Sequence, residues 1–225
     1  MPLTLSQLRD EVRLNLKRDS TVLPDSRLTR WLNQAQLELA QLRSWEEMRE
    51  IYETSTVSGQ FRYAFPVRAK EFFSIRLLDG TTYRKLIYVP SRDADRYLDD
   101  STSSGVPEVY IDYGSNFELY PIPDGVYELR ARISQFPVDL SADSDTSALR
   151  NKDLLLVAGA TILGLQSLKE IEDANCWRAS VYGPMLQAAI AADHRGDDWD
   201  AQLQPFSPGI SFPEDPHSVW AGILK

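Results

Sequence analysis

Residues 154–165 read Leu-Leu-Leu-Val-Ala-Gly-Ala-Thr-Ile-Leu-Gly-Leu, and this uncharged stretch decides how the chain folds. A helix that is apolar on every face must be covered by protein or by lipid. The stretch is shorter than the roughly 20 residues that a helix needs to cross a bilayer, so it predicts a core helix surrounded by other elements. Gly159 and Gly164 each lower helix propensity by about 1 kcal/mol. They indicate close approach of another helix, from the same chain or from a second subunit.

Composition and charge limit the classes of function. The chain has 225 residues, 43% hydrophobic and 25% charged, as is typical of a soluble globular protein that buries a core without disulfides. Cys176 is the single cysteine, which fits a reducing compartment, and the first residues lack the pattern of a signal peptide. We therefore expect synthesis in the cytoplasm. The net charge of −9 argues against tight nucleic-acid binding but allows DNA to pass close by without specific binding.

The first part of the chain, residues 1–48, predicts a pair of helices. Thr4 and Gln7 have the spacing of a capping box. Apolar residues then recur every three or four positions between residues 5 and 16. A short linker ends at Pro24, and Asp25 is expected to be the N-cap of a second amphipathic helix that runs to about residue 42. Two such helices with a short connection indicate an antiparallel pair.

From residue 49 the apolar residues alternate with a period of two. Asp79-Gly80 is a strong hairpin signal, and residues 81–89 follow as one returning strand. Residues 90–98 resemble one or two helical turns, and three further strands are expected at 108–113, 116–120 and 126–136. Short strands separated by turns predict an inserted antiparallel β-sandwich or barrel over residues 49–140.

Residues 141–196 predict the C-terminal helix pair. The apolar helix is expected to begin at Ser147 or Asn151, and the next helix at about residue 173. Pro184 lies inside that last pattern and should kink the helix or reset its start, because proline removes one hydrogen bond. The fold class is therefore α+β: N- and C-terminal helix pairs form a bundle, a β domain is inserted between them, and an extended tail follows.

The tail, residues 197–225, contains four prolines that exclude a long helix. It is nevertheless rich in large apolar side chains, which disordered tails normally lack. Such a segment orders only against a surface, either on its own subunit or on a partner, and we favour a partner. The expected contact residues are Leu203, Phe206, Ile210, Phe212, Val219, Trp220, Ile223 and Leu224.

The sequence offers little for catalysis. His194 and His217 are the only histidines, so no His₂ or His/Cys metal cluster can form. We interpret Cys176 as a buried helical cysteine with a packing role. No glycine-rich phosphate loop is present. We therefore predict no catalytic, cofactor-binding or metal-binding residues and a protein that is not an enzyme. A pair of carboxylates could still serve glycan hydrolysis, although no particular pair stands out.

Tyrosines and phenylalanines cluster in the predicted β domain and would suit stacking against sugars. Aromatic side chains are favoured on pleated, half-buried surfaces in any case. We therefore favour core packing over a carbohydrate-binding module, which stays an alternative.

Four stretches carry a family resemblance: 31–39 (WLNQAQLEL), 107–114 (PEVYIDYG), 117–124 (FELYPIPD) and 136–141 (FPVDLS). Their order along the chain resembles that of the head-to-tail adaptor (neck) proteins of tailed bacteriophages, especially of short-tailed phages. The resemblance covers nearly the whole chain in element order.

This resemblance implies a structural protein of the virion neck, and another neck or tail-completion protein is the closest alternative. It implies a homo-oligomeric ring of twelve subunits below the portal, with genomic DNA running through its centre. The β domain would meet the next tail component, such as a nozzle protein, and the C-terminal tail would clasp the portal. Gly159 and Gly164 would then lie where neighbouring subunits pack.

Overall fold

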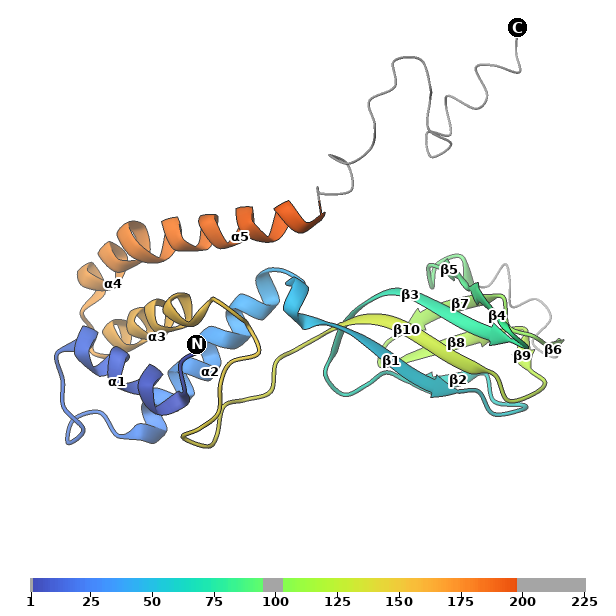
Figure 1. Cartoon of the computed structure of the whole chain (residues 1–225), viewed down its shortest axis with the longest axis horizontal. Coiled ribbons are helices and arrows are strands. Elements are labelled where there is room, and N and C mark those ends of the chain that lie inside the picture. Colours follow the sequence, from blue (N-terminus) through green and yellow to red (C-terminus); the bar gives the residue numbers. More distant parts are fainter. Residues whose placement is uncertain (1, 95–102, 198–225) are drawn as a thin grey trace, which may run out of the picture. The chain divides into compact units, whose positions relative to one another are not determined.

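The computed structural model of the chain describes residues 2–94 and 103–197 (Figure 1). It confirms the α+β class, with helices at both ends of the described chain and strands between them. The chain divides into two units, Met1–Leu186 and Gln187–Lys225, and the description below concerns the first unit and helix α5, which crosses the division. The predicted bundle and sandwich arrangements stay predictions.

The two N-terminal helices form largely as expected. Helix α1 (Leu5–Leu16) begins with the predicted capping box, in which the Thr4 N–H donates to Oε1 of Gln7 at 3.0 Å and the Thr4 hydroxyl accepts from the Gln7 N–H. Helix α2 (Asp25–Leu42) follows. Asp25 is the first residue of this helix and Pro24 precedes it, so the prediction of Asp25 as N-cap is wrong. Its carboxylate accepts a hydrogen bond from Arg13 instead.

Helix α3 (Asp153–Ser167) contains the apolar stretch and contacts α1, α2 and α4 (Ile171–Trp177). Most of its side chains are buried, as predicted, although Leu154 in its first turn is 62% exposed. The helix begins later than expected. Ser147 donates its hydroxyl to Gln36 at 2.8 Å, and Asn151 has a φ of +58°, which a helix does not allow.

The C-terminal helix is interrupted before Pro184. A π-helical turn, η3 (Arg178–Tyr182), follows α4, and α5 (Gly183–Asp197) begins directly after it. Pro184 is the second residue of α5, inside a continuous helical run, and the π-helical turn directly before it is the local irregularity that accompanies the proline. Helical backbone continues from Arg178 through Gly183, so the alternative that Pro184 resets the start of a helix is wrong, and the alternative of a kink stays a prediction.

A short 3₁₀ helix, η1 (Glu46–Met48), leads from α2 into the β domain. One sheet has the strand order β1-β10-β3-β4 and a second has the order β2-β8-β7-β5. A third sheet contains only β6 and β9. The strands are β1 (Arg49–Ser55), β2 (Arg62–Ala64), β3 (Ala69–Asp79), β4 (Thr82–Lys85), β5 (Ile87–Val89), β6 (Ser104–Gly105), β7 (Val109–Tyr113), β8 (Asn116–Tyr120), β9 (Ile122–Pro123) and β10 (Glu128–Gln135).

Three features of the sheets differ from expectation. No sheet closes on itself among the described residues, so the predicted barrel is wrong. The run 81–89 is two strands, because the buried residue Leu86 separates β4 in one sheet from β5 in the other. Strand β5 pairs in parallel with β7, and β6 pairs in parallel with β9, so the domain is not wholly antiparallel.

Two main clusters of buried side chains hold the first unit together. The helical cluster combines residues of α1, α2, α3 and α4 with Leu140. The second cluster draws side chains from both four-stranded sheets: Ile75 and Leu77 of β3 and Ile133 of β10 join Phe117 and Leu119 of β8. Alternate residues of β10 are buried, which leaves the residues between them on the opposite, solvent-exposed face of its sheet.

Candidate interaction surfaces

The eight tail residues predicted to bind a partner, from Leu203 to Leu224, lie outside the described residues. The structure therefore does not test them.

The two glycines of α3 lie against helices of their own chain. A Cβ at Gly159 would be 3.1 Å from Cβ of Ala35, and a Cβ at Gly164 would be 2.7 Å from Cδ1 of Leu16 and 3.2 Å from Cζ3 of Trp31. Contacts this short leave no room for a methyl group without movement of the neighbours. Packing within one subunit thus accounts for both glycines, and their role between subunits stays a prediction.

The connection from α2 to the β domain is tightly held. Trp45 is fully buried, and its indole N–H donates to the carbonyl of Leu39 at 2.8 Å. The Lys152 ammonium lies 4.6 Å from the Trp45 ring centroid and 2.6 Å from Oε1 of Glu47. A cation over an aromatic face and beside a carboxylate is favourable in both contacts.

A second cation fixes the start of β3 to the end of α2. Lys70 donates to the carbonyl oxygens of Ala40 at 2.6 Å and Gln41 at 3.3 Å, at the negative end of the helix dipole. Burial lowers the pKa of Lys70, and the neighbouring Glu71 carboxylate opposes that shift. Ser44 also donates to Glu71 at 2.6 Å. These contacts fix where the β domain attaches to α2.

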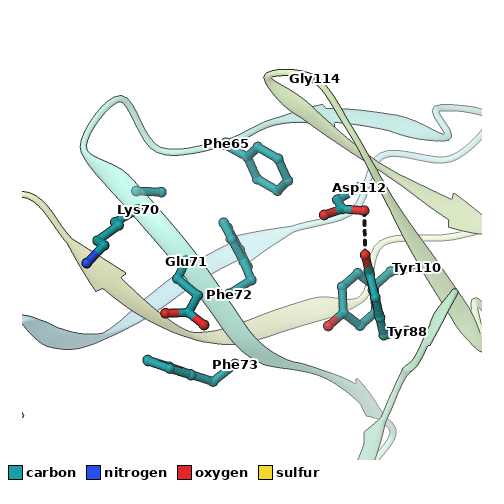
Figure 2. Close-up of a pocket in the computed structure, with 10 residues that line it drawn as sticks. Phe65, Lys70, Glu71, Phe72, Phe73, Tyr88, Tyr110, Asp112 and Gly114 are labelled. Carbon is teal, nitrogen blue, oxygen red and sulfur yellow. Dashed lines mark hydrogen bonds between the residues drawn. The ribbon is translucent and has the colours of Figure 1, made fainter. Parts of the chain in front are cut away.

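Residues of the β domain line a cavity of about 540 Å³, and Figure 2 shows their side chains around it. Phe65 and Phe72, with ring centroids 4.5 Å apart, lie on one side of it. On the other side the Tyr88 hydroxyl donates to Oδ1 of Asp112 at 2.8 Å. That hydrogen bond raises the pKa of Tyr88, and burial of the ring adds to the effect. Burial also raises the pKa of Tyr110. The cavity is aromatic and acidic, and the Lys70 ammonium points away from it.

Most aromatic side chains of the β domain contribute to the core, as the sequence analysis favoured. Tyr63, Tyr110 and Phe117 are buried in the second cluster, and the Tyr63 and Phe117 rings stack with centroids 5.5 Å apart. Tyr88 and Tyr113 are exposed. Aromatic content in this domain is therefore explained mainly by packing.

A β-bulge in β3 brings Phe73 to the surface. Phe72 pairs with Ile133 and Ser74 pairs with Arg132, so Phe73 is an extra residue without a partner in β10. Phe72 packs against the core, whereas Phe73 is 41% exposed. Bulges redirect side chains in this way and are frequent beside functional sites.

Phe73 borders a second cavity, of about 740 Å³, on the solvent-exposed face of the sheet β1-β10-β3-β4. Ile51 of β1, 60% exposed, also lines it. The guanidinium carbon of Arg49 lies 5.6 Å from the Phe73 ring centroid. We call this surface the outer sheet face and define it by Arg49, Ile51, Glu53, Phe73, Arg76, Lys85, Glu128, Arg130 and Arg132, five cations against two carboxylates.

The sequence analysis missed this surface. The available signal was Phe72-Phe73, two adjacent aromatic residues that interrupt the alternation of β3. Only one of two neighbouring strand residues can face the core unless a bulge intervenes. The bulge is defined by how β3 pairs with β10, and the sequence of β3 alone does not give that pairing.

The described residues contain no group of three or more side chains suited to hold a metal ion. Among them, no helix is long and apolar enough to cross a membrane. Cys176 is exposed, so the expectation of a buried cysteine is wrong; its position on α4 turns it toward solvent, 4.0 Å from the Ser180 hydroxyl.

Comparison with protein families found one that spans the helices and the β domain together. The family described as SU10 adaptor protein matches residues 3–206. The chain belongs to this family. The resemblance to head-to-tail adaptors of short-tailed bacteriophages is thereby confirmed. Comparison with curated protein sequences found no match.

As an SU10 adaptor protein, the chain is a structural protein of a bacteriophage. Membership implies a place in the virion neck and interaction with portal and tail proteins. Of the predicted partner-binding residues, Leu203 and Phe206 fall within the matched range. The other six lie beyond residue 206, so family membership says nothing about them.

Proposed function

We propose that this adaptor forms a ring of twelve subunits that joins the portal to the tail and encloses part of the DNA channel. The observation that carries the proposal is the family match over residues 3–206, which includes both helix pairs and the inserted β domain. A closed ring of identical subunits uses the same two surfaces of each copy, so it needs no further component to close.

The C-terminal tail is the proposed portal-binding segment. The eight apolar residues named above, Leu203 to Leu224, cannot form a core of their own among four prolines, and a groove on a neighbouring protein would bury them. Twelve such attachments act together, because each bound tail raises the effective concentration of the others. A weak contact per subunit would then give a stable joint.

The net charge of −9 supports passage of DNA without adhesion. Carboxylates repel phosphates within about one Debye length, roughly 8 Å at physiological salt. Tight binding would need lysines and arginines along the channel. We therefore propose a conduit that makes no sequence-specific contact with the genome.

The test is to mix the purified protein with its portal and to record electron micrographs. We expect rings on the portal with the full-length chain. A variant that lacks residues 200–225 should remain folded and soluble, because it keeps both main core clusters, whose members lie between Leu3 and Tyr182, but should not attach.

Attachment of the shortened variant would contradict the clasp, and loss of folding would show that the tail belongs to the subunit's own core. Binding to tail protein but never to portal would favour another neck or tail-completion protein.

A further inference from the structure

We propose that the outer sheet face binds an acidic protein surface from which an apolar side chain projects. The inference rests on the proposed function in one respect: in the virion neck, the partner would be the tail component below the ring. It adds the surface of the adaptor that makes the contact and the chemistry of its partner.

The first argument is an excess of positive charge. Arg130, Arg76 and Lys85 lie opposite one another on β10, β3 and β4. Like charges in directly opposite positions destabilise a sheet. Arg130 is neutralised, since Glu53 lies 2.8 Å and Glu128 3.0 Å from its Nε.

Two other arginines of the outer sheet face, Arg76 and Arg132, lack such neutralisation. Neither Arg76 nor Arg132 forms an ion pair with any residue in the ranges 2–94 and 103–197. Among the residues that line the second cavity, Glu50 is the one acidic side chain beside Arg49 and Arg132. In a protein of net charge −9, this face is therefore a place where a partner's carboxylates relieve repulsion.

The second argument is the apolar centre. Phe73 and Ile51 line one cavity, and the bulge holds Phe73 outward at a cost in regular pairing. Exposed aromatic and arginine side chains around a pocket are the residues that dominate binding energy in protein interfaces.

These features favour a protein partner over duplex DNA. A DNA backbone would satisfy the arginines but offers no apolar side chain for the cavity beside Phe73 and Ile51. An acidic segment with one projecting apolar residue satisfies both.

The test uses the nozzle protein of the same phage as the probe and measures its binding to the purified adaptor, with portal attachment measured in a separate assay. We expect Phe73→Ser and Arg132→Glu each to weaken nozzle binding at least tenfold while portal attachment is unchanged. Tyr113→Ser, at an exposed aromatic at the end of β7, and Arg30→Glu, on α2, are matched controls that should bind as wild type. Raising NaCl from about 0.1 to 0.5 M should weaken wild-type binding more than binding of Arg132→Glu.

Three results would overturn the inference. Both outer-face variants could bind nozzle as wild type does, or they could fail to form rings, which would make the face a contact between copies. The variants could also keep nozzle binding but lose binding to a 30-base-pair DNA duplex, which would make the face a DNA-binding surface. The proposed function fails separately. Wild-type rings that bind nozzle through this face but never bind portal would support the inference and contradict the portal joint.

Discussion

At the scale of single residues, two arginines of α1 organise the start of α2. Arg9 is buried and lies 3.3 Å from Oδ2 of Asp25 and 2.7 Å from Oδ1 of Asp143. Arg13 donates to the same Asp25 carboxylate and lies 3.1 Å from Asp10. A carboxylate shared by two guanidiniums joins α1 to α2.

We predict a stabilisation by Asp25 that depends on pH. The hydrogen bond from Arg13, with the charges of Arg13 and Arg9, holds the pKa of Asp25 below its ordinary 3.8, against the opposing effect of burial. Because the folded-state pKa is depressed, the stabilisation is fully present above the unfolded pKa and is lost as the pH falls through the folded pKa. Asp25→Asn should therefore melt below wild type at pH 6, and the difference in Tm should shrink steadily below about pH 4.

Thermal melts between pH 2 and 7 measure this difference. Asp139→Asn, at an exposed carboxylate, is the control and should follow wild type throughout. A gap between Asp25→Asn and wild type that stays constant down to pH 2 would contradict the assignment.

A second residue-scale prediction concerns Gly159. Gly159→Ala gains about 1 kcal/mol in helix propensity but places its methyl 3.1 Å from Cβ of Ala35, and such overpacking costs about 1–3 kcal/mol. We expect a net loss of about 1 kcal/mol in urea unfolding. Adding Ala35→Gly removes the opposing methyl. The double variant should therefore lose less unfolding free energy than the sum of the losses in the two single variants.

The glycine experiment also separates packing within a subunit from packing between subunits. A Gly159→Ala protein as stable as wild type but unable to form rings would assign the glycine to the subunit interface instead.

At the scale of elements, the bulge in β3 makes an unusual deletion tolerable. Removing Phe73 leaves Phe72 facing the core, Ser74 outward and Ile75 facing the core, which is the alternation of a regular strand. We expect the deletion to keep the far-ultraviolet circular dichroism spectrum and a cooperative melt. Deleting Arg130 should unfold the domain, because it turns one half of β10 to the wrong face. An unfolded Phe73 deletion would mean that the bulge is needed for folding.

Local chemistry made several elements predictable. The Thr4 capping box, the apolar period of α1 and the Asp79-Gly80 hairpin signal depend on neighbours in sequence, and each appears in the structure. The start of α3 and the role of Asp25 were predicted wrongly because distant partners, Gln36 and Arg13, hold Ser147 and Asp25.

The division of residues 81–89 between two sheets could not be predicted for the same reason. Thr82 to Val89 alternates like one strand, and only the pairing of β5 with β7, more than twenty residues away, separates it from β4. The outer sheet face was missed because its charges come from four strands that are distant in sequence.

At the scale of the whole molecule, family membership places the chain in the virion neck, and the proposed role of the tail is to attach it to the portal. We predict that Trp220→Ala weakens portal binding by tenfold or more, whereas Lys225→Ala changes it less than threefold. A buried aromatic anchor contributes more to binding than a charge at the rim of an interface. Titration of portal with each full-length variant measures both, and equal effects would contradict an aromatic anchor.

The strands by which the chain enters and leaves the β domain are hydrogen-bonded neighbours: Arg49 at the start of β1 pairs with Ser134 near the end of β10 (Figure 1). Such partners lie only about 5 Å apart. A two- or three-residue bridge could therefore replace everything between them without stretching the helical part. The β domain is therefore an insertion that evolution could replace as a unit, so that related phages could bind different tail proteins while keeping the same helices.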